Sequence, residues 1–103
     1  MERKHVRIEY RVRPDVDLEE LERDITAFVD GIRAHRESNL YTSYRDTADP
    51  RHFVHIGEFD AEQVAGLQQQ DFFKRFATRL RERCAVPPEV TTLSVVRSTR
   101  HSS

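Results

Sequence analysis

The segment His52-Phe53-Val54-His55-Ile56-Gly57-Glu58-Phe59 decides the fold that this sequence predicts. Its aromatic and β-branched residues are typical of a β-strand, and apolar side chains alternate onto both of its faces. Such a strand is expected in a sheet that is covered on both sides. Residues 40–45 are also rich in strand formers, and a polar loop containing Asp49-Pro50, a sequence typical of turns, joins the two segments. We therefore expect two neighbouring antiparallel strands.

Patterns on either side of this pair predict two helices and two more strands. Residues 6–12 alternate apolar with charged side chains, so a strand there should place its apolar set under the helices. Asp17 is a good N-cap for a helix that runs to about His35. Residues 60–84 predict a second helix with a break near its three glutamines. Residues 90–96 form the expected last strand.

The resulting order of strand, helix, strand, strand, helix and strand is that of the ferredoxin-like α+β fold. This fold has one antiparallel sheet with both helices on one face. We expect one such domain over residues 1–96 and a frayed tail over residues 97–103. Because the helices leave the other face of the sheet uncovered, the fold predicts a partner, a ligand or both.

The composition narrows the function classes. The chain has 103 residues, 34% of them charged, and a formal net charge of −1, so it lacks the basic excess of a nucleic-acid-binding protein. An RNA-recognition module shares the order of elements, but residues 52–59 do not match the pattern of its third strand. The charged residues 1–5 predict a cytoplasmic protein with neither a signal peptide nor a membrane span.

Motifs for metal binding or nucleophilic catalysis are absent from the sequence. The five histidines lack metal-ligand spacing, and His52 and His55 should lie on opposite faces of a strand. The three glycines are scattered, so no phosphate-binding loop is predicted. Cys84, the only cysteine, is expected to be a buried and inert thiol, with a reactive thiol as the alternative. We expect neither a metal nor a cofactor.

The uncovered face of the sheet is the expected functional site. If Val54 and Ile56 face the helices, His55 and its aromatic neighbours face the other way, beside the arginines of the first strand. Apolar walls with a few polar groups are typical of small-molecule sites. His55 could act as an acid or base near neutral pH, or be only a hydrogen-bonded interface residue. Tyr41 or Tyr44 could lend a hydroxyl to a ligand, or keep that hydroxyl in water.

Short motifs spread along the chain carry a family resemblance. They are Tyr41-Thr42-Ser43-Tyr44-Arg45, Phe53-Val54-His55, Glu58-Phe59 before a helix, and the broken second helix with Phe72, Phe73 and Phe76. With them the chain resembles the antibiotic-biosynthesis monooxygenase family of dimeric α+β barrel proteins over about residues 6–96. The resemblance implies a homodimer whose two sheets face each other around a cavity. It also implies the activity of some members, which oxidise phenolic, quinol or anthrone-like substrates with molecular oxygen and without metal or flavin.

The resemblance favours a cofactor-independent monooxygenase that acts on a small aromatic substrate of the quinol, anthrone or polyketide type. His55 would be the base or hydrogen-bond partner, an arginine would stabilise the substrate anion, and Tyr44 and Gln68 would orient the ring. The predicted catalytic residues are His55, Tyr44 and Arg11, and the predicted substrate-binding residues are Tyr41, Phe53, Phe59, Gln68, Phe72 and Arg7.

A non-catalytic dimer of the same fold, which binds a small molecule or assists a biosynthetic enzyme, is the alternative. Many members of the family carry Trp at the position of Phe59 and His near the position of Gln68. A glutamine cannot serve as a general base. Non-redox chemistry in the same cavity, such as cyclisation or isomerisation, also remains open.

Overall fold

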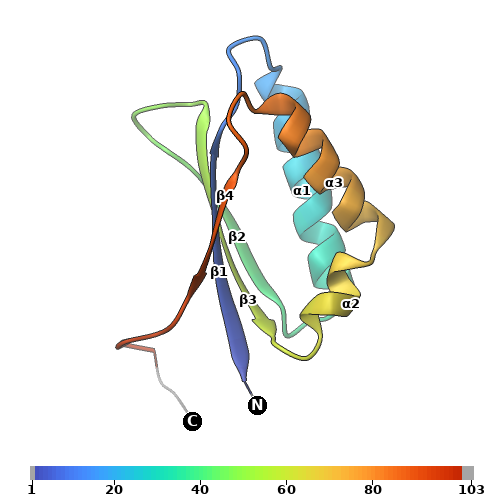
Figure 1. Ribbon diagram of the computed structural model, residues 1–103, viewed down its shortest axis with the longest axis vertical. Helices are drawn as coiled ribbons and strands as arrows, with labels where there is room; N and C mark the ends of the chain where they lie inside the picture. The colour runs from blue at the N-terminus through green and yellow to red at the C-terminus, as the bar shows by residue number, and fades with distance from the viewer. Residues whose placement is uncertain (1, 101–103) are drawn as a thin grey trace.

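The computed structural model describes residues 2–100 and has the expected order of elements, with the second helix in two pieces. The elements are β1 (Arg3–Arg11), α1 (Leu18–His35), β2 (Leu40–Arg45), β3 (His52–Asp60), α2 (Val64–Gln68), α3 (Asp71–Arg83) and β4 (Glu89–Leu93). The strands form one antiparallel sheet in the order β2-β3-β1-β4, and the helices lie together on one side of it (Figure 1). The ferredoxin-like fold is therefore confirmed.

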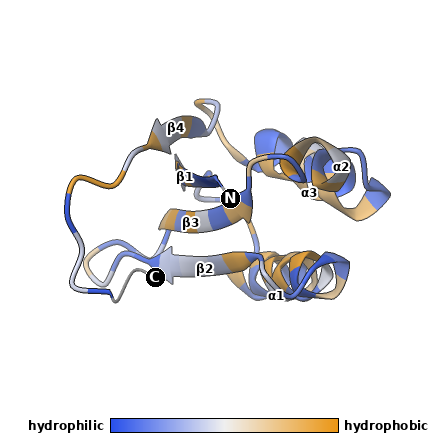
Figure 2. Cartoon of the chain, turned by 90° about the horizontal axis from the view of Figure 1, so that it is seen from below, coloured by the Kyte–Doolittle hydropathy of each residue, from blue (hydrophilic) through white to orange (hydrophobic). Residues whose placement is uncertain are grey.

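The helix α1 begins and ends where the sequence predicts. The Asp17 carboxylate accepts hydrogen bonds from the backbone N–H groups of Glu19 and Glu20, as an N-cap does. Its apolar stripe, which includes Phe28 and Ile32, packs toward the sheet, and Figure 2 shows the helices as one layer beside the strands. Gly31 has a packing role, because a Cβ at this position would lie 2.6 Å from the ring of Phe72.

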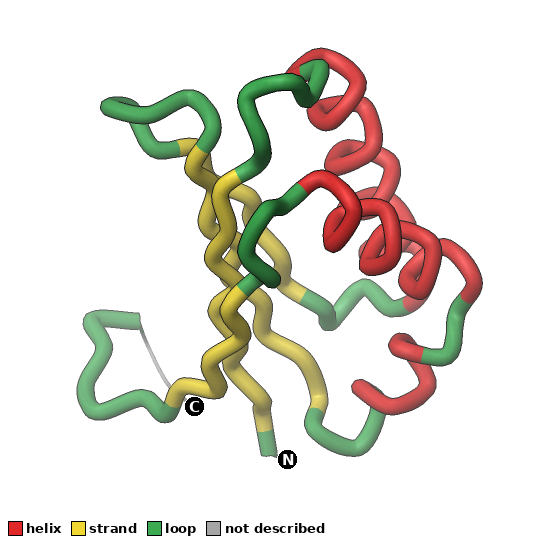
Figure 3. The backbone as a smooth tube through the Cα atoms, turned by 45° about the horizontal axis from the view of Figure 1, so that its top comes forward, coloured by secondary structure: helices red, strands yellow, loops and turns green. Residues whose placement is uncertain are grey.

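The second helix is broken at the glutamines, as predicted, and starts later than expected. The break lies between α2 and α3, and Figure 3 shows it as a loop between two helical pieces. Asp60 has a side chain that is typical of an N-cap, but it does not cap this helix. It is the last residue of β3, and its carboxylate binds Arg3 and Ser38 instead of a helix N-terminus. Cys84 follows α3 and is buried, which raises the pKa of its thiol and agrees with an inert role.

The last strand is shorter than the predicted range 90–96, because β4 ends at Leu93. Val95 and Val96 lie beyond it and are exposed. Of the expected tail, residues 97–100 have no regular secondary structure, and residues 101–103 lie outside the described part of the chain. Within the described part, no helix has the length and apolar character needed to cross a membrane.

The orientation of β3 is the reverse of the prediction. Phe53, His55 and Phe59 are buried against the helices, whereas Val54 and Ile56 are only half-buried on the opposite side. We call that opposite side, which no helix covers, the open face. The pairing with β1 follows the same division: His55 lies opposite Ile8, which faces the helices, and Ile56 lies opposite Arg7. Both sides of β3 are apolar, so its sequence alone did not decide which side the helices cover.

Candidate ligand cavity

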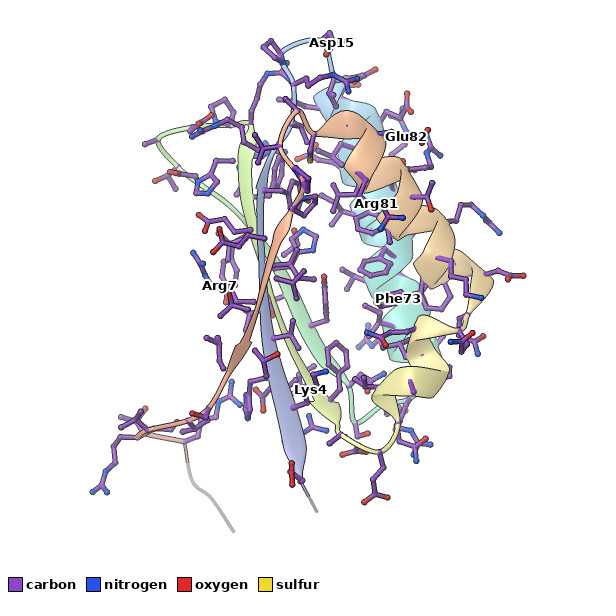
Figure 4. All side chains as sticks on the ribbon, viewed as in Figure 1. Lys4, Arg7, Asp15, Phe73, Arg81 and Glu82 are labelled. Carbon is purple, nitrogen blue, oxygen red and sulfur yellow. The ribbon has the colours of Figure 1, made fainter. Side chains whose placement is uncertain are left out.

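A cavity of about 260 Å³ lies between the helices and the covered face of the sheet. It is close to the lower end of the range of roughly 300–1,000 Å³ that is typical of small-molecule sites. Figure 4 shows Phe73 and Arg81 of α3, and Lys4 of β1, on this side of the sheet, with Arg7 on the other. Most of the lining is apolar: Val6, Ile8, Phe28, Phe59, Val64, Leu67, Phe73, Phe76, Ala77, Leu80, Pro87, Pro88 and Val90.

His55 is the polar centre of the cavity wall. Only 1% of its surface is exposed, and both of its ring nitrogens are hydrogen-bonded to tyrosines. Nε2 lies 2.8 Å from the hydroxyl oxygen of Tyr10, and Nδ1 lies 2.8 Å from that of Tyr41. Burial lowers the pKa of His55 to about 4 and raises the pKa values of both tyrosines. All three side chains are therefore uncharged at neutral pH.

Aromatic contacts hold this centre in place. The ring of His55 stacks on Phe76 with a centroid separation of 6.3 Å, and the ring of Tyr41 meets Phe28 edge-on at 5.4 Å. Gly57 makes room for the wall, because a Cβ there would lie 2.6 Å from the ring of Phe59 and 3.0 Å from that of Tyr41. The cavity is thus bounded by rings that pack on one another, which restricts where a ligand can lie.

The remaining polar lining residues carry a positive charge or an amide. They are Lys4, Arg81 and Gln68, and no acidic residue lines the cavity. Within residues 2–100, neither Lys4 nor Arg81 has a carboxylate within salt-bridge distance. Two cations without paired anions beside an apolar space favour a negatively charged ligand. Across residues 2–100, no group of three or more histidine, cysteine or acidic side chains could hold a metal ion.

The cavity brings together part of the predicted site. His55, Tyr41, Phe59 and Gln68 line it, although on the covered side of the sheet and not on the open face. Two further predicted residues lie on the covered side away from this cavity. Phe53 is buried in the core and borders a hollow beside α1, and Phe72 packs over Gly31 between α1 and α3.

Three predicted residues lie on the open face, so the prediction that they lie beside His55 is wrong. Tyr44 pairs with Val54 and is 54% exposed. Arg7 forms an ion pair with Glu9, and Arg11 forms one with Asp49. The reason is the alternation of side chains along a strand, which puts these residues and His55 on opposite sides once β3 turns His55 toward the helices.

Tyr10 is a residue of this site that was not predicted from the sequence. Tyr10 belongs to the apolar set of β1, and it is the only member of that set with a hydroxyl group. A buried hydroxyl needs a hydrogen-bond partner, and that requirement was a usable signal for a polar neighbour on β3. Lys4, Phe73, Phe76 and Arg81 gave no such signal, because their place at the cavity depends on how the helices lie across the sheet.

Comparison with known proteins identifies the fold but no close relative. No protein-family model matches the sequence, and the search of curated proteins finds no match. Among solved structures, SnoaB from Streptomyces nogalater, described as a cofactor-independent oxygenase, matches with a TM-score of 0.79 at 16% identity, covering 98% of this chain and 100% of its own. PA3566 from Pseudomonas aeruginosa matches with a TM-score of 0.76 at 23% identity, covering 94% of this chain and 97% of its own.

A third structure, described as an antibiotic biosynthesis monooxygenase, matches with a TM-score of 0.68 at 18% identity, covering 91% of this chain and 99% of its own. Identities this low establish similarity of fold and not of activity. The chain therefore has the fold of the antibiotic-biosynthesis monooxygenases, as its sequence motifs predict.

Proposed function

We propose that this protein is a cofactor-independent monooxygenase that oxidises a small aromatic substrate of the quinol, anthrone or polyketide type. The observation that carries the proposal is the uncharged His55, held between two tyrosine hydroxyls on the wall of an apolar cavity. The cations Lys4 and Arg81 at the same cavity favour the anion that such a substrate must form. The fold shared with SnoaB, an oxygenase described as cofactor-independent, supports the same reaction class.

The reaction needs no cofactor because the substrate anion is itself the reductant. The substrate binds as its enolate, having already lost one proton of an activated methylene to bulk water. This carbanion transfers electrons to molecular oxygen and combines with it to form a peroxide at that carbon. The peroxide takes up one proton. Loss of the second hydrogen of the methylene then breaks the O–O bond. One oxygen atom remains as a carbonyl and the other leaves as water.

In this proposal His55 is a hydrogen-bond partner and not a free base. Its pKa is about 4, and both of its nitrogens are occupied by tyrosines. Of the two tyrosines, only Tyr41 lines the cavity, so its hydroxyl is the group that meets a substrate oxygen. Lys4 and Arg81 stabilise the anion electrostatically, and the phenylalanine walls exclude water from the reacting carbon.

Oxygen consumption with a panel of quinols and anthrones tests the proposal. The wild-type protein should consume oxygen with at least one of them, and Tyr41→Phe should lower kcat/KM by at least about 10-fold, because it removes the hydroxyl that contacts the substrate oxygen. Tyr44→Phe is the matched control, since it removes a tyrosine hydroxyl from the open face and should leave the rate unchanged. Equal rates for the two variants, or no oxygen consumption with any substrate, would overturn the proposal.

We also propose that the open face pairs with a second copy of the chain. This face exposes Leu40, Tyr44 and Leu93 beside the half-buried Ile56, and a second copy of the chain would remove these side chains from water. Light scattering of the purified protein should give the mass of a dimer. Ile56→Arg should give a folded monomer, because it places a charge at the centre of the face. A monomeric wild-type protein at micromolar concentration would contradict the pairing.

Non-catalytic binding is the second candidate function, and one observation favours it. Both nitrogens of His55 are engaged and Gln68 cannot accept a proton, so neither supplies a free general base at the cavity. A binding protein would show a higher melting temperature with an aromatic ligand and no oxygen consumption. Turnover with any member of the substrate panel would exclude this reading.

A further inference from the structure

We propose that Tyr10 fixes the direction of the hydrogen bonds through His55, so that the Tyr41 hydroxyl donates into the cavity and selects a ligand oxygen that accepts: a phenolate, an enolate or a carbonyl. The inference names the substrate class of the cavity and rests on the proposed function only in taking this cavity as the ligand site. Tyr10 is a positioning residue in this scheme, because it acts through His55 and does not line the cavity.

The two tyrosine partners of His55 cannot both donate to its ring, and they cannot both accept from it. A neutral imidazole carries one N–H donor and one bare nitrogen acceptor. His55 is almost completely buried, and burial opposes the doubly protonated form. One of its two tyrosine partners must therefore donate a hydrogen bond to the ring, and the other must accept one from it.

Burial of Tyr10 determines which of the two tyrosines donates its hydrogen bond to His55. Tyr10 is 4% exposed, and within residues 2–100 the only hydrogen-bond partner of its hydroxyl is Nε2 of His55. If Nε2 carried the hydrogen, the Tyr10 hydroxyl would accept that bond, and its own hydrogen would be buried without an acceptor. Folded proteins avoid such buried unpaired donors. Tyr10 therefore donates to Nε2, and Nδ1 of His55 carries the ring hydrogen.

The direction of the hydrogen bond between Tyr10 and His55 sets that of the bond to Tyr41 at the cavity. Nδ1–H donates to the hydroxyl oxygen of Tyr41, which leaves the Tyr41 hydrogen free to point toward a ligand. Each donor in such a series strengthens the next, so Tyr41 becomes a better donor than an isolated tyrosine. A ligand group that can only donate, such as an ammonium, could not accept this hydrogen and would leave the Tyr41 donor unpaired. Lys4 and Arg81 add positive charge on the same side, so an anionic oxygen is favoured most.

Nitrogen NMR of the ligand-free protein tests the hydrogen position directly. The signals of selectively labelled histidine should show His55 as the Nδ1–H tautomer, with Nε2 unprotonated, at neutral pH. The Nε2–H tautomer would overturn the inference while leaving the proposed oxygenase intact. This measurement uses the wild-type protein, so it stays decisive even if a variant fails to fold.

Binding of a chromophoric phenol tests the selection of an acceptor. The probe is 4-nitrophenol, whose ionised form has its own absorbance band, and 4-nitroanisole is the matched ligand without an ionisable hydroxyl. The bound phenol should have its pKa lowered by about one unit, which means that the phenolate binds about 10-fold more tightly than the neutral phenol. Tyr10→Phe should reduce this shift to the part that Lys4 and Arg81 contribute, while leaving the affinity for 4-nitroanisole unchanged. Tyr44→Phe should keep the shift.

The outcomes separate this inference from the proposed function. An unshifted or raised pKa of the bound phenol, or a shift that Tyr10→Phe leaves undiminished, would overturn the role of Tyr10. Loss of affinity for both probes in Tyr10→Phe would show a merely structural residue and would also overturn it. Oxygen consumption that fails while the phenolate still binds preferentially would overturn the oxygenase alone.

Discussion

The two faces of the sheet shift the pKa of histidine in opposite directions. His52 and His55 lie three residues apart on β3. On the open face, both nitrogens of His52 lie within hydrogen-bond distance of carboxylates, at 2.8 Å from Asp46 and 2.6 Å from Glu9, and these contacts raise the pKa of His52. On the covered face, His55 has only tyrosine partners, and burial lowers its pKa to about 4. The surroundings of each histidine, and not the residue type, therefore decide which one stays uncharged beside an apolar cavity.

Replacing each histidine with leucine should give the largest difference between the two faces. His55→Leu leaves the buried hydroxyls of Tyr10 and Tyr41 without their partner, which should cost roughly 2–5 kcal/mol of unfolding free energy. His52→Leu breaks two half-exposed ion pairs and should cost several times less. Urea unfolding of the two variants measures both values. Equal losses would show that the covered face does not depend on its hydrogen bonds.

The pH dependence of stability should separate the same two residues. The pKa of His55 is depressed in the folded protein, so below pH 6.5 the unfolded chain takes up a proton that the folded chain does not. The unfolding free energy should therefore fall by about 3 kcal/mol between pH 6.5 and 4. His52 acts with the opposite sign. Its contribution is present below pH 6.5 and is lost as the pH rises through its raised folded pKa.

Urea unfolding at several pH values measures these contributions in the two leucine variants. His55→Leu should lose the slope between pH 6.5 and 4, and His52→Leu should retain it. Carboxylates with lowered pKa values, such as Asp60, add their own loss of stability at more acidic pH in every variant, so only the differences between curves are compared. A wild-type slope that persists in His55→Leu would assign it to another group.

The contrast between the faces also explains which parts of the fold and of the site could be predicted from the sequence. The alternation of Val6, Ile8, Tyr10 and Val12 with charged residues correctly oriented β1, because only one of its sides is apolar. The Asp17 cap of α1 and the break between α2 and α3 were likewise local signals. For β3 the alternation of side chains did not predict the orientation, since both sides are apolar. Which side faces the helices depends on which aromatic rings fill the space under them. That choice involves residues far apart in the chain, among them Phe28, Tyr41 and Phe76.

Adding one methyl group to the covered face should have a smaller but clear effect. Gly57→Ala places a Cβ 2.6 Å from the ring of Phe59, which is itself buried and packed against Tyr41, and should cost about 1–3 kcal/mol of unfolding free energy. Gly66→Ala is the matched control, because a Cβ there meets nothing within 4 Å. It should leave the protein as stable or raise the midpoint slightly. Equal midpoints for the two variants would mean that the Phe59 ring moves freely.

Removing two positive charges from one face or from the other should have the smallest effect, which is a change in the affinity for a phenolate. It compares the charges of the two faces directly. Lys4→Gln with Arg81→Gln removes two positive charges from the cavity, whereas Arg7→Gln with Arg11→Gln removes two from the open face. The net charge changes equally, so only location differs. The cavity pair should weaken binding of a phenolate several-fold, and added salt should reduce the difference. The open-face pair should leave the affinity unchanged, because its arginines are paired with Glu9 and Asp49 on the far side of the sheet. Equal weakening by both pairs would mean that overall charge, and not the placement of Lys4 and Arg81 at the cavity, attracts the anion.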